Sequence, residues 1–245
     1  MSSAPSKRPP LSGAARHAAA KKPKNPVPKG PSSHEIRIIG GQWRRTRLKV
    51  IDKPGLRPTP DRVRETLFNW LGQDLSAWRC VDAFAGTGVL GLEAASRGAA
   101  HVLMVEQDTV LVRDLQDNAT RLKAGMVSVQ RGDGVAALLR LPPSSVDLVF
   151  IDPPFDGPLF EPALKAAVRA VPVGGWIYLE APVAWPADAL GALGLQCERH
   201  LKAGAVHAHL LQRTSLEPLP TASATSDIPA TPVTPVTPPP EGDMP

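Results

Sequence analysis

Acidic side chains stand at the ends of four apolar runs in the middle of this 245-residue sequence. The runs are RCVDAF, HVLMVEQD, VSVQRGDG and VDLVFIDPPF, and the acids near their ends are Asp82, Glu106, Asp133 and Asp152. If the runs are parallel strands, their carboxyl ends meet at one edge of the sheet, where open α/β sheets bind ligands. The spacing therefore predicts a pocket lined by carboxylates at that edge.

Two glycines follow the first acid, in the stretch DAFAGTGVLGLEAASRG. Gly86 and Gly88 predict a tight turn into a helix, where the backbone can approach a ligand because no Cβ intervenes. A GxG turn alone is weak evidence for a particular ligand, since nucleotide-binding folds and purely structural turns share it. Here Asp82 stands four residues before the first glycine, and its negative charge would repel a pyrophosphate. The turn therefore favours a ligand with an amino group.

The next two acids suit a ligand that contains a nucleoside. Glu106 lies about 20 residues beyond the glycine turn, where an acid can accept hydrogen bonds from both hydroxyls of a ribose. Asp133 could accept a hydrogen bond from an exocyclic amine. An amino acid joined to a ribose and an adenine is S-adenosylmethionine, which is the cofactor that the sequence predicts. The expected cofactor contacts are Asp82, Phe84, Gly86, Gly88, Glu106, Gln107, Asp133 and Gly134.

The fourth run ends in Asp152, Pro153, Pro154 and Phe155, which are the expected catalytic residues. Two prolines end the hydrogen-bond ladder of a strand, because each lacks a backbone N–H and fixes φ. The carboxylate and the rigidly aimed Pro153 carbonyl can both accept hydrogen bonds, and the phenylalanine ring supplies a flat apolar face. This combination suits an extruded nucleobase with an NH₂ group. Methyl transfer to that amine then needs mainly proximity and electrostatic positioning.

Short apolar runs alternate with helical patterns from residue 79 onward. Helices are expected to begin near Val89, Asp108, Gly134 and Leu159. After Gly174 the runs WIYLEAP, LQCERHL and AVHAHLLQR follow, and the last two predict an antiparallel pair. Alternation of this kind predicts an α/β fold with a mostly parallel sheet and helices on both faces.

An N-terminal extension precedes this pattern. EIRIIGG and RTRLKVI predict a β-hairpin with a cationic polar face. In the following PTPDRVRETLFNWL, the Thr59 hydroxyl suits the N-cap and Pro60 the first turn of a helix. Val63, Leu67, Trp70 and Leu71 recur on one face of that helix.

The prolines divide the chain. Residues 1–33 hold seven of the 28 prolines and residues 216–245 hold nine, so both segments are expected to be disordered tails, the first basic and the second acidic. The expected domains are therefore residues 1–33, a tail; 34–78, the hairpin and helix; 79–215, the α/β domain; and 216–245, a second tail. The formal net charge is +5, and neither a membrane span nor a secretory signal is indicated, so a cytoplasmic protein is expected.

No metal site is predicted. Cys80 and Cys197 belong to no CxxC pair, and both are expected to be small core residues. His207 and His209 fall on one face of a predicted strand, but a third ligand is missing nearby.

The motifs together resemble those of a known enzyme family. DAFAGTG, VEQD, a GD pair and DPPF resemble class I methyltransferases that act on exocyclic amino nitrogens. More narrowly, IRIIGGQWRRTRLKV, RPTPDRVRETLFNWL, FIDPPF and KAGAVHAHLLQR look like the guanine-N2 methyltransferases of small-subunit (16S) ribosomal RNA, D type. The resemblance spans nearly all of residues 35–213.

The resemblance implies a Rossmann-like, seven-stranded methyltransferase sheet with a small N-terminal extension. It also implies a monomer that acts on 16S ribosomal RNA, within a small ribosomal subunit or an assembly intermediate, and an RNA-binding segment beside the active site. The expected RNA contacts are Arg37, Arg44, Arg45, Arg57, Thr59, Arg62 and Arg64. Arginines on phosphates position an RNA without reading its sequence, so the target must be chosen by shape and by the extruded base.

Three other functions remain open. An amine methyltransferase acting on DNA adenine N6 or on a protein amide would use a similar site, although the short connections after Phe155 leave no room for a DNA-recognition domain. A non-catalytic RNA-binding assembly factor could retain the fold, but the intact set of acids argues against it. A nicotinamide-dependent oxidoreductase is disfavoured by the glycine spacing.

Overall fold

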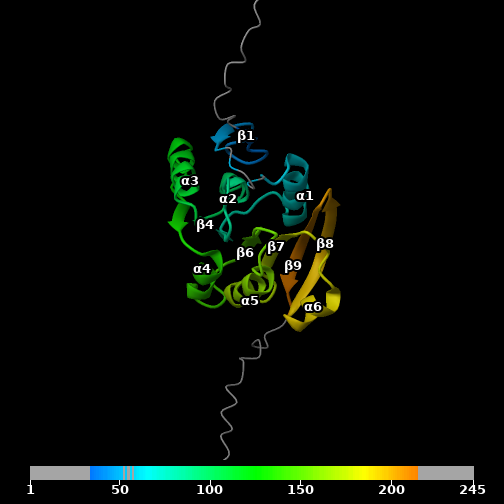
Figure 1. Ribbon diagram of the computed structural model, residues 1–245. Coiled ribbons are helices and arrows are strands. Elements are labelled where there is room, and N and C mark those ends of the chain that lie inside the picture. Colours follow the sequence, from blue (N-terminus) through cyan, green and yellow to red (C-terminus); the bar gives the residue numbers. More distant parts are fainter. Residues whose placement is uncertain (1–33, 52, 54–55, 57, 215–245) are drawn as a thin grey trace, which may run out of the picture. The chain divides into compact units, whose positions relative to one another are not determined.

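A seven-stranded sheet forms the centre of the protein (Figure 1). The computed structural model describes residues 34–51, 53, 56 and 58–214. The strand order is β5-β4-β3-β6-β7-β9-β8, in which β9 runs in the opposite direction to the other six strands. The strands are β3 (Arg79–Asp82), β4 (His101–Glu106), β5 (Val127–Arg131), β6 (Leu148–Ile151), β7 (Trp176–Ala181), β8 (Leu195–Ala203) and β9 (Val206–Arg213). The expected α/β fold is confirmed.

Helices cover both faces of this sheet. The first face is covered by α1 (Asp61–Leu71), α2 (Val89–Ser96) and α3 (Thr109–Arg121), and the second by α4 (Gly134–Arg140), α5 (Phe160–Ala170) and α6 (Ala187–Ala192). In Figure 1 the first three lie above the sheet and the last three below it. The expected helices α2 to α5 are confirmed. Helix α6 was not predicted, because six residues are too few to show a helical period.

The alternation of side chains along the strands decides which residues face which helices. Phe150 and Tyr178 lie opposite one another on β6 and β7 and belong to the core beneath α1 and α2. Val149 and Ile177, one residue earlier, belong to the core beneath α4 and α5. Since the side-chain period of a strand is two, residues 82, 152 and 180 are expected on the α1 side of the sheet. That places three carboxylates on one side.

The N-terminal hairpin packs on the same side of the molecule as α1 and α2. Strands β1 (His34–Arg37) and β2 (Arg47–Val50) pair antiparallel, as expected, and Ile36 and Leu48 belong to the core on that side. The hairpin loop touches the end of α2 so closely that a Cβ on Gly41 (φ +71°) would lie 1.8 Å from the Ser96 carbonyl oxygen. Only glycine fits this contact.

A buried carboxylate ties this hairpin to the helices. Glu93 on α2 is fully buried and accepts hydrogen bonds from the backbone N–H groups of Ile39 (2.9 Å) and Gly40 (2.7 Å). It also pairs with Arg64 (3.2 Å) and Arg97 (2.9 Å). The hairpin, α1 and α2 therefore share one ion cluster.

Arg97 does more than end its helix. It is the C-cap of α2, but it also lies 4.5 Å above the Phe68 ring, in addition to its ion pair with Glu93. A planar guanidinium can stack on an aromatic face while its edge pairs with a carboxylate. Arg97 is therefore a part of the core.

The start of α1 corrects one expectation. Pro60, not Thr59, is the N-cap, and no side chain caps this helix. The Thr59 hydroxyl instead bonds to the carboxyl of Glu180 on β7. On the helix itself Val63, Leu67 and Leu71 are buried as expected.

The two cysteines have different environments. Cys80 lies in the core, as expected, whereas Cys197 is exposed, so its expected burial is wrong. The reason is that β8 is an edge strand with most of its residues exposed. Both expected tails lie outside the described residues. Among the described helices, none has the length and apolar character needed to cross a membrane.

Three histidines stack on β8 and β9. The ring of His200 lies 5.1 Å from that of His207 and 4.7 Å from that of His209. His209 is buried, and its Nε2 accepts the Trp185 N–H at 3.2 Å, which requires the neutral ring. Within the described part of the chain, no group of three or more metal-binding side chains is suited to a metal ion.

We expect protonation of His209 to destabilise the protein in acid. Burial, followed by the charge of His200, lowers the pKa of His209 to about 4. Because the unfolded His209 keeps its ordinary pKa near 6.5, the stabilisation is present above pH 6.5 and is lost as the pH falls towards 4, by about 3 kcal/mol. The measurement is urea unfolding of the wild type and of His209→Gln between pH 7 and 4.5. The difference in free energy of unfolding between the two proteins should shrink as the pH falls; a constant difference for His209→Gln would contradict the expectation.

Candidate active site

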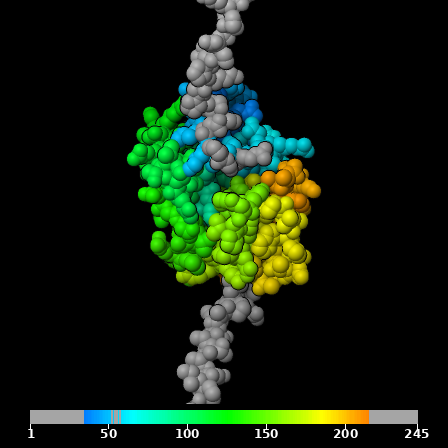
Figure 2. Space-filling model, in the orientation of Figure 1, coloured from blue at the N-terminus to red at the C-terminus, as the bar shows by residue number. Residues whose placement is uncertain are grey.

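A cavity of about 470 Å³ lies at the carboxyl ends of β3, β4 and β6. It is lined from five parts of the chain. These are the segment before α1, the turn after β3, the end of β4, the loop after β5 and the loop after β6. In Figure 2 the cyan atoms of α1 form one continuous surface with the orange atoms of the C-terminal strands, beside the yellow-green atoms of α5. The cavity therefore lies where the sequence predicted a pocket, at the carboxyl edge of the sheet.

The glycine turn lies at the floor of this cavity. Gly86 (φ +50°) donates its N–H to Glu106 Oε2 at 2.9 Å, and Asp108 donates its N–H to Glu106 Oε1 at 2.8 Å. Both oxygens of Glu106 are therefore held in place at the end of β4. Gly88 (φ +73°) has Leu115 so close that a Cβ would lie 2.3 Å from it. Gly86 lines the cavity, whereas Gly88 does not line it and is needed for the close contact of the turn with the core.

Asp82 is almost fully buried beside the turn. Its Oδ2 accepts the Gly91 N–H at 3.0 Å. Burial raises its pKa to about 7; the hydrogen bond from Gly91 opposes the shift and the charge of Glu106 adds to it. A cation next to this carboxylate would restore its ionised form. The site therefore suits a positively charged ligand group.

The loop after β5 contributes glycines to the cavity. Gly132 and Gly134 line it, and a Cβ on Gly134 would lie 2.1 Å from the Ala83 carbonyl oxygen. The Asp133 carboxylate is engaged elsewhere, because it caps α4 through the Ala136 N–H (2.7 Å) and accepts from Gln107 Nε2 (3.0 Å). Asp133 is exposed and does not line the cavity, so its carboxylate positions the loop and Gln107, which does line it.

All four residues after β6 line the cavity. Asp152 is half-buried, and its pKa is raised well above its usual range by burial, then by the charges of Glu180 and Asp82. Phe155 is 40% exposed and its ring lies 6.1 Å from that of Phe160. The two prolines between them carry the chain from the end of β6 to that aromatic pair. The structure thus brings a carboxyl group, a proline turn and an open ring face together at one side of the cavity.

Glu180 was not predicted from the sequence. It is 3% exposed, accepts the Tyr178 hydroxyl at 2.8 Å and bonds to the Thr59 hydroxyl. In the register of β6 and β7, Ile151 lies opposite Leu179, so Glu180 is the next position opposite Asp152. The signal was present in WIYLEAP, since an acid in an otherwise apolar strand needs partners when it is buried.

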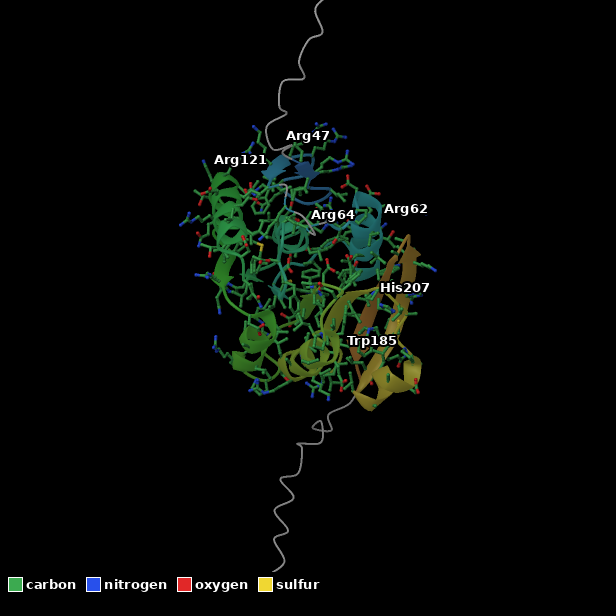
Figure 3. All side chains as sticks on the ribbon, in the orientation of Figure 1. Arg47, Arg62, Arg64, Arg121, Trp185 and His207 are labelled. Carbon is green, nitrogen blue, oxygen red and sulfur yellow. The ribbon has the colours of Figure 1, made fainter. Side chains whose placement is uncertain are left out.

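The expected RNA contacts fall into three groups. Arg44, Arg45 and Arg62 are exposed, and Arg37 is exposed but pairs with Asp61 at 2.9 Å. Arg57 lies outside the described residues. Figure 3 shows Arg47, Arg62 and Arg121 pointing outward from the hairpin, α1 and α3. The hairpin, α1 and α3 therefore each carry at least one of these outward-pointing arginines.

Arg64 is a correction to that set. Arg64 is 1% exposed, pairs with Asp61 (2.5 Å) and Glu93 (3.2 Å), and donates its Nε to the Thr59 carbonyl (3.1 Å). Figure 3 places it inside the molecule. A guanidinium with these partners cannot reach a phosphate. Thr59 is buried as well, although it lines the cavity.

Comparisons with known proteins agree with this arrangement. A family described as "Conserved hypothetical protein 95" matches residues 36–212. "Ribosomal RNA small subunit methyltransferase D" of Escherichia coli K12 is 44% identical over 154 residues, 63% of this chain and 75% of the relative, and its namesake in Haemophilus influenzae is 42% identical over 148 residues, 59% and 75% of the two chains. The solved structure of yhhF, a candidate methyltransferase of Escherichia coli, is 37% identical with a TM-score of 0.64 and covers 74% of this chain and 99% of that one. With a family match over most of the chain and relatives of this identity, the chain belongs to the ribosomal RNA small subunit methyltransferase D family.

Proposed function

We propose that this protein transfers a methyl group from S-adenosylmethionine to the exocyclic N2 amine of a guanine in small-subunit ribosomal RNA. The observation that carries the proposal is that Asp152, Pro153 and Phe155, after β6, line the same cavity as the glycine turn after the neighbouring strand β3. The names of the relatives support the class of reaction and of substrate. The base and its atom rest on the chemistry of the site.

The cavity suits the cofactor in three respects. Asp82, buried and with a raised pKa, would pair with the ammonium group of the amino acid. Glu106, held through both oxygens by backbone N–H groups, would accept from the ribose hydroxyls. Gly86, Gly132 and Gly134 line the cavity without side chains, so the backbone can approach the cofactor there. When bound, the cofactor supplies an electrophilic methyl group on a positively charged sulfur.

The residues after β6 would hold the base. An exocyclic amine is a poor nucleophile, because its lone pair is delocalised into the ring. Acceptance of its hydrogens by the Asp152 carboxylate and the Pro153 carbonyl favours the geometry in which the lone pair faces the methyl group. Phe155, with its exposed ring, would stack on the flat face of the base. Positioning and charge are therefore the main contributions of these residues.

The test is methyl transfer from labelled S-adenosylmethionine, followed by nucleoside analysis. The substrates are small-subunit particles from a strain that lacks the protein, free ribosomal RNA, and DNA. Label in N2-methylguanosine is the expected result, and the better RNA substrate shows whether an assembled shape is read. Label in N6-methyladenine or in protein would overturn the substrate, and binding of RNA and cofactor without transfer to any substrate would favour a non-catalytic assembly factor.

We expect charge reversal on the exposed arginines to weaken RNA binding. The variant Arg44→Glu/Arg45→Glu removes two cations of the hairpin loop, both exposed. For each phosphate that the variant no longer binds, the slope of log K against log salt should become shallower by about one. The measurement is RNA affinity at several salt concentrations, with Arg140→Glu on α4 as the matched control. An unchanged slope for the double variant would place the RNA on another surface.

A further inference from the structure

The buried carboxyl of Glu180 is the strongest feature of the site that the proposed function leaves unused. It lies at the end of β7, on the same side of the sheet as Asp152 and one register position beyond the Ile151–Leu179 pair. Its hydrogen bonds come from Tyr178 and Thr59. Burial of an acid is unfavourable, and two hydroxyl donors would be enough to satisfy it as a structural group.

Two observations connect Glu180 to the cavity. Thr59, to which it bonds, lines the cavity, and the Thr59 carbonyl is held in turn by Arg64 Nε at 3.1 Å. Glu180 thus fixes the side chain of a residue whose backbone is already fixed. The segment before α1 is tied to the end of β7 at the point where it meets the base side of the cavity.

The second connection is electrostatic. The charged groups that face Asp152 are Glu180 from β7 and Asp82 from β3, and Tyr178 adds a phenol next to Glu180. Thr59, from the segment before α1, is neutral. Burial and the charge of Glu180 raise the pKa of Asp152, and burial raises that of Glu180. Neighbouring carboxyls of this kind hold a proton between them more readily than either would alone.

We propose that Glu180 is a positioning residue for methyl transfer, which anchors Thr59 in the wall of the base pocket and keeps a carboxyl group beside Asp152. The proposal rests on the proposed function and adds a residue to it. In the reaction the bond from sulfur to the methyl carbon breaks as the bond from nitrogen to that carbon forms, and the amine then loses one proton. Asp152 takes that proton, and the neighbouring carboxylate makes the protonated state of Asp152 more favourable.

Two substitutions separate the two roles. Glu180→Gln keeps the size and a hydrogen-bonding group but removes the charge, whereas Glu180→Asp keeps the charge but shortens the reach to Thr59. For Glu180→Gln we expect kcat at neutral pH to fall about tenfold and the acid limb of the kcat/KM profile to move to lower pH. For Glu180→Asp we expect the limb to stay in place and KM for RNA to rise. The exposed Glu161→Gln on α5 is the matched control and should change neither.

A merely structural role predicts a different pattern. Both variants would then lose activity with an unmoved acid limb, and that result would overturn the proposal. Thr59→Val, which removes the hydroxyl alone, should reproduce the KM effect of Glu180→Asp; a wild-type KM for Thr59→Val would overturn the anchoring role.

A measurement without substrate distinguishes this proposal from the proposed function. Carbon-13 NMR titration of the side-chain carboxyls in the wild-type protein, with Asp152→Asn and Glu180→Gln for assignment, should show that Asp152 and Glu180 titrate together in two steps. Independent titration of the two would overturn the coupling, whatever the enzyme methylates. If the two carboxyls of the wild type titrate together but the wild type transfers no methyl group to guanine, the proposed function alone would be overturned.

Discussion

Asp152→Ala is expected to lower kcat for methyl transfer by about 100- to 1000-fold, which is the usual loss when one preorganised hydrogen-bonding group of a transition state is removed. Asp152 lines the cavity between the end of β6 and the proline turn. Its carboxylate is the only side-chain acceptor among the four residues of that turn. Without it the amine would keep one acceptor, the Pro153 carbonyl, and would lose the group that takes its proton.

Binding of the cofactor should survive the same substitution. Asp82 and Glu106, which would hold the amino acid and the ribose, keep their own backbone donors in the variant. The Kd for S-adenosylmethionine, measured by calorimetry, should therefore remain within about threefold of the wild-type value, a change below 1 kcal/mol. Asp156→Ala, four residues later and exposed, is the matched control and should keep the wild-type kcat. Transfer by Asp152→Ala at the wild-type rate would show that the base is held elsewhere.

The acids at the strand ends could be predicted because their positions depend on local pattern alone. An apolar run followed by an acid and a glycine or proline marks the carboxyl end of a parallel strand, and all such ends share one edge. Asp82, Glu106 and Asp152 are at the cavity for this reason. Asp133 differs, because the start of α4 immediately after it uses the carboxylate as a cap. A sequence can show that an acid ends a strand, but it does not show which hydrogen-bond donor the carboxylate binds in the folded protein.

The residues that were misjudged depend on contacts between distant segments. Arg64 is an arginine in a basic segment, which is typical of an RNA-binding residue. It is buried instead, because it pairs with Glu93, which is 29 positions away and lies on another helix. The helical spacing did indicate its burial, because Arg64 precedes Phe68 by one turn of α1 and both residues are buried. Thr59 and Glu180 are 121 positions apart, and only the packing of α1 on the sheet brings them together. Buried polar pairs of this kind cannot be predicted from the pattern of any single segment of the sequence.

Glu93→Gln is expected to lower the free energy of unfolding by about 3–5 kcal/mol, the usual cost of removing one partner from a buried ion pair. Glu93 is fully buried and opposes two buried guanidinium groups, those of Arg64 and Arg97. The amide of glutamine would accept fewer hydrogen bonds than the five that reach the carboxylate, and it would turn its NH₂ towards donors. Both arginines would then be charged, buried and short of a partner.

The location of the loss matters as much as its size, because Glu93 holds the hairpin through Ile39 and Gly40 and holds α1 through Arg64. Arg64 in turn holds the Thr59 carbonyl beside the cavity. Urea unfolding should therefore show the full loss, and amide exchange should show the largest gain at the hairpin. Glu161→Gln, which breaks an exposed ion pair with Lys165, should cost less than about 1 kcal/mol. A loss of that small size for Glu93→Gln would mean that the apolar packing of Ile36, Leu48 and their neighbours holds the extension in place, and that the buried ions only orient it.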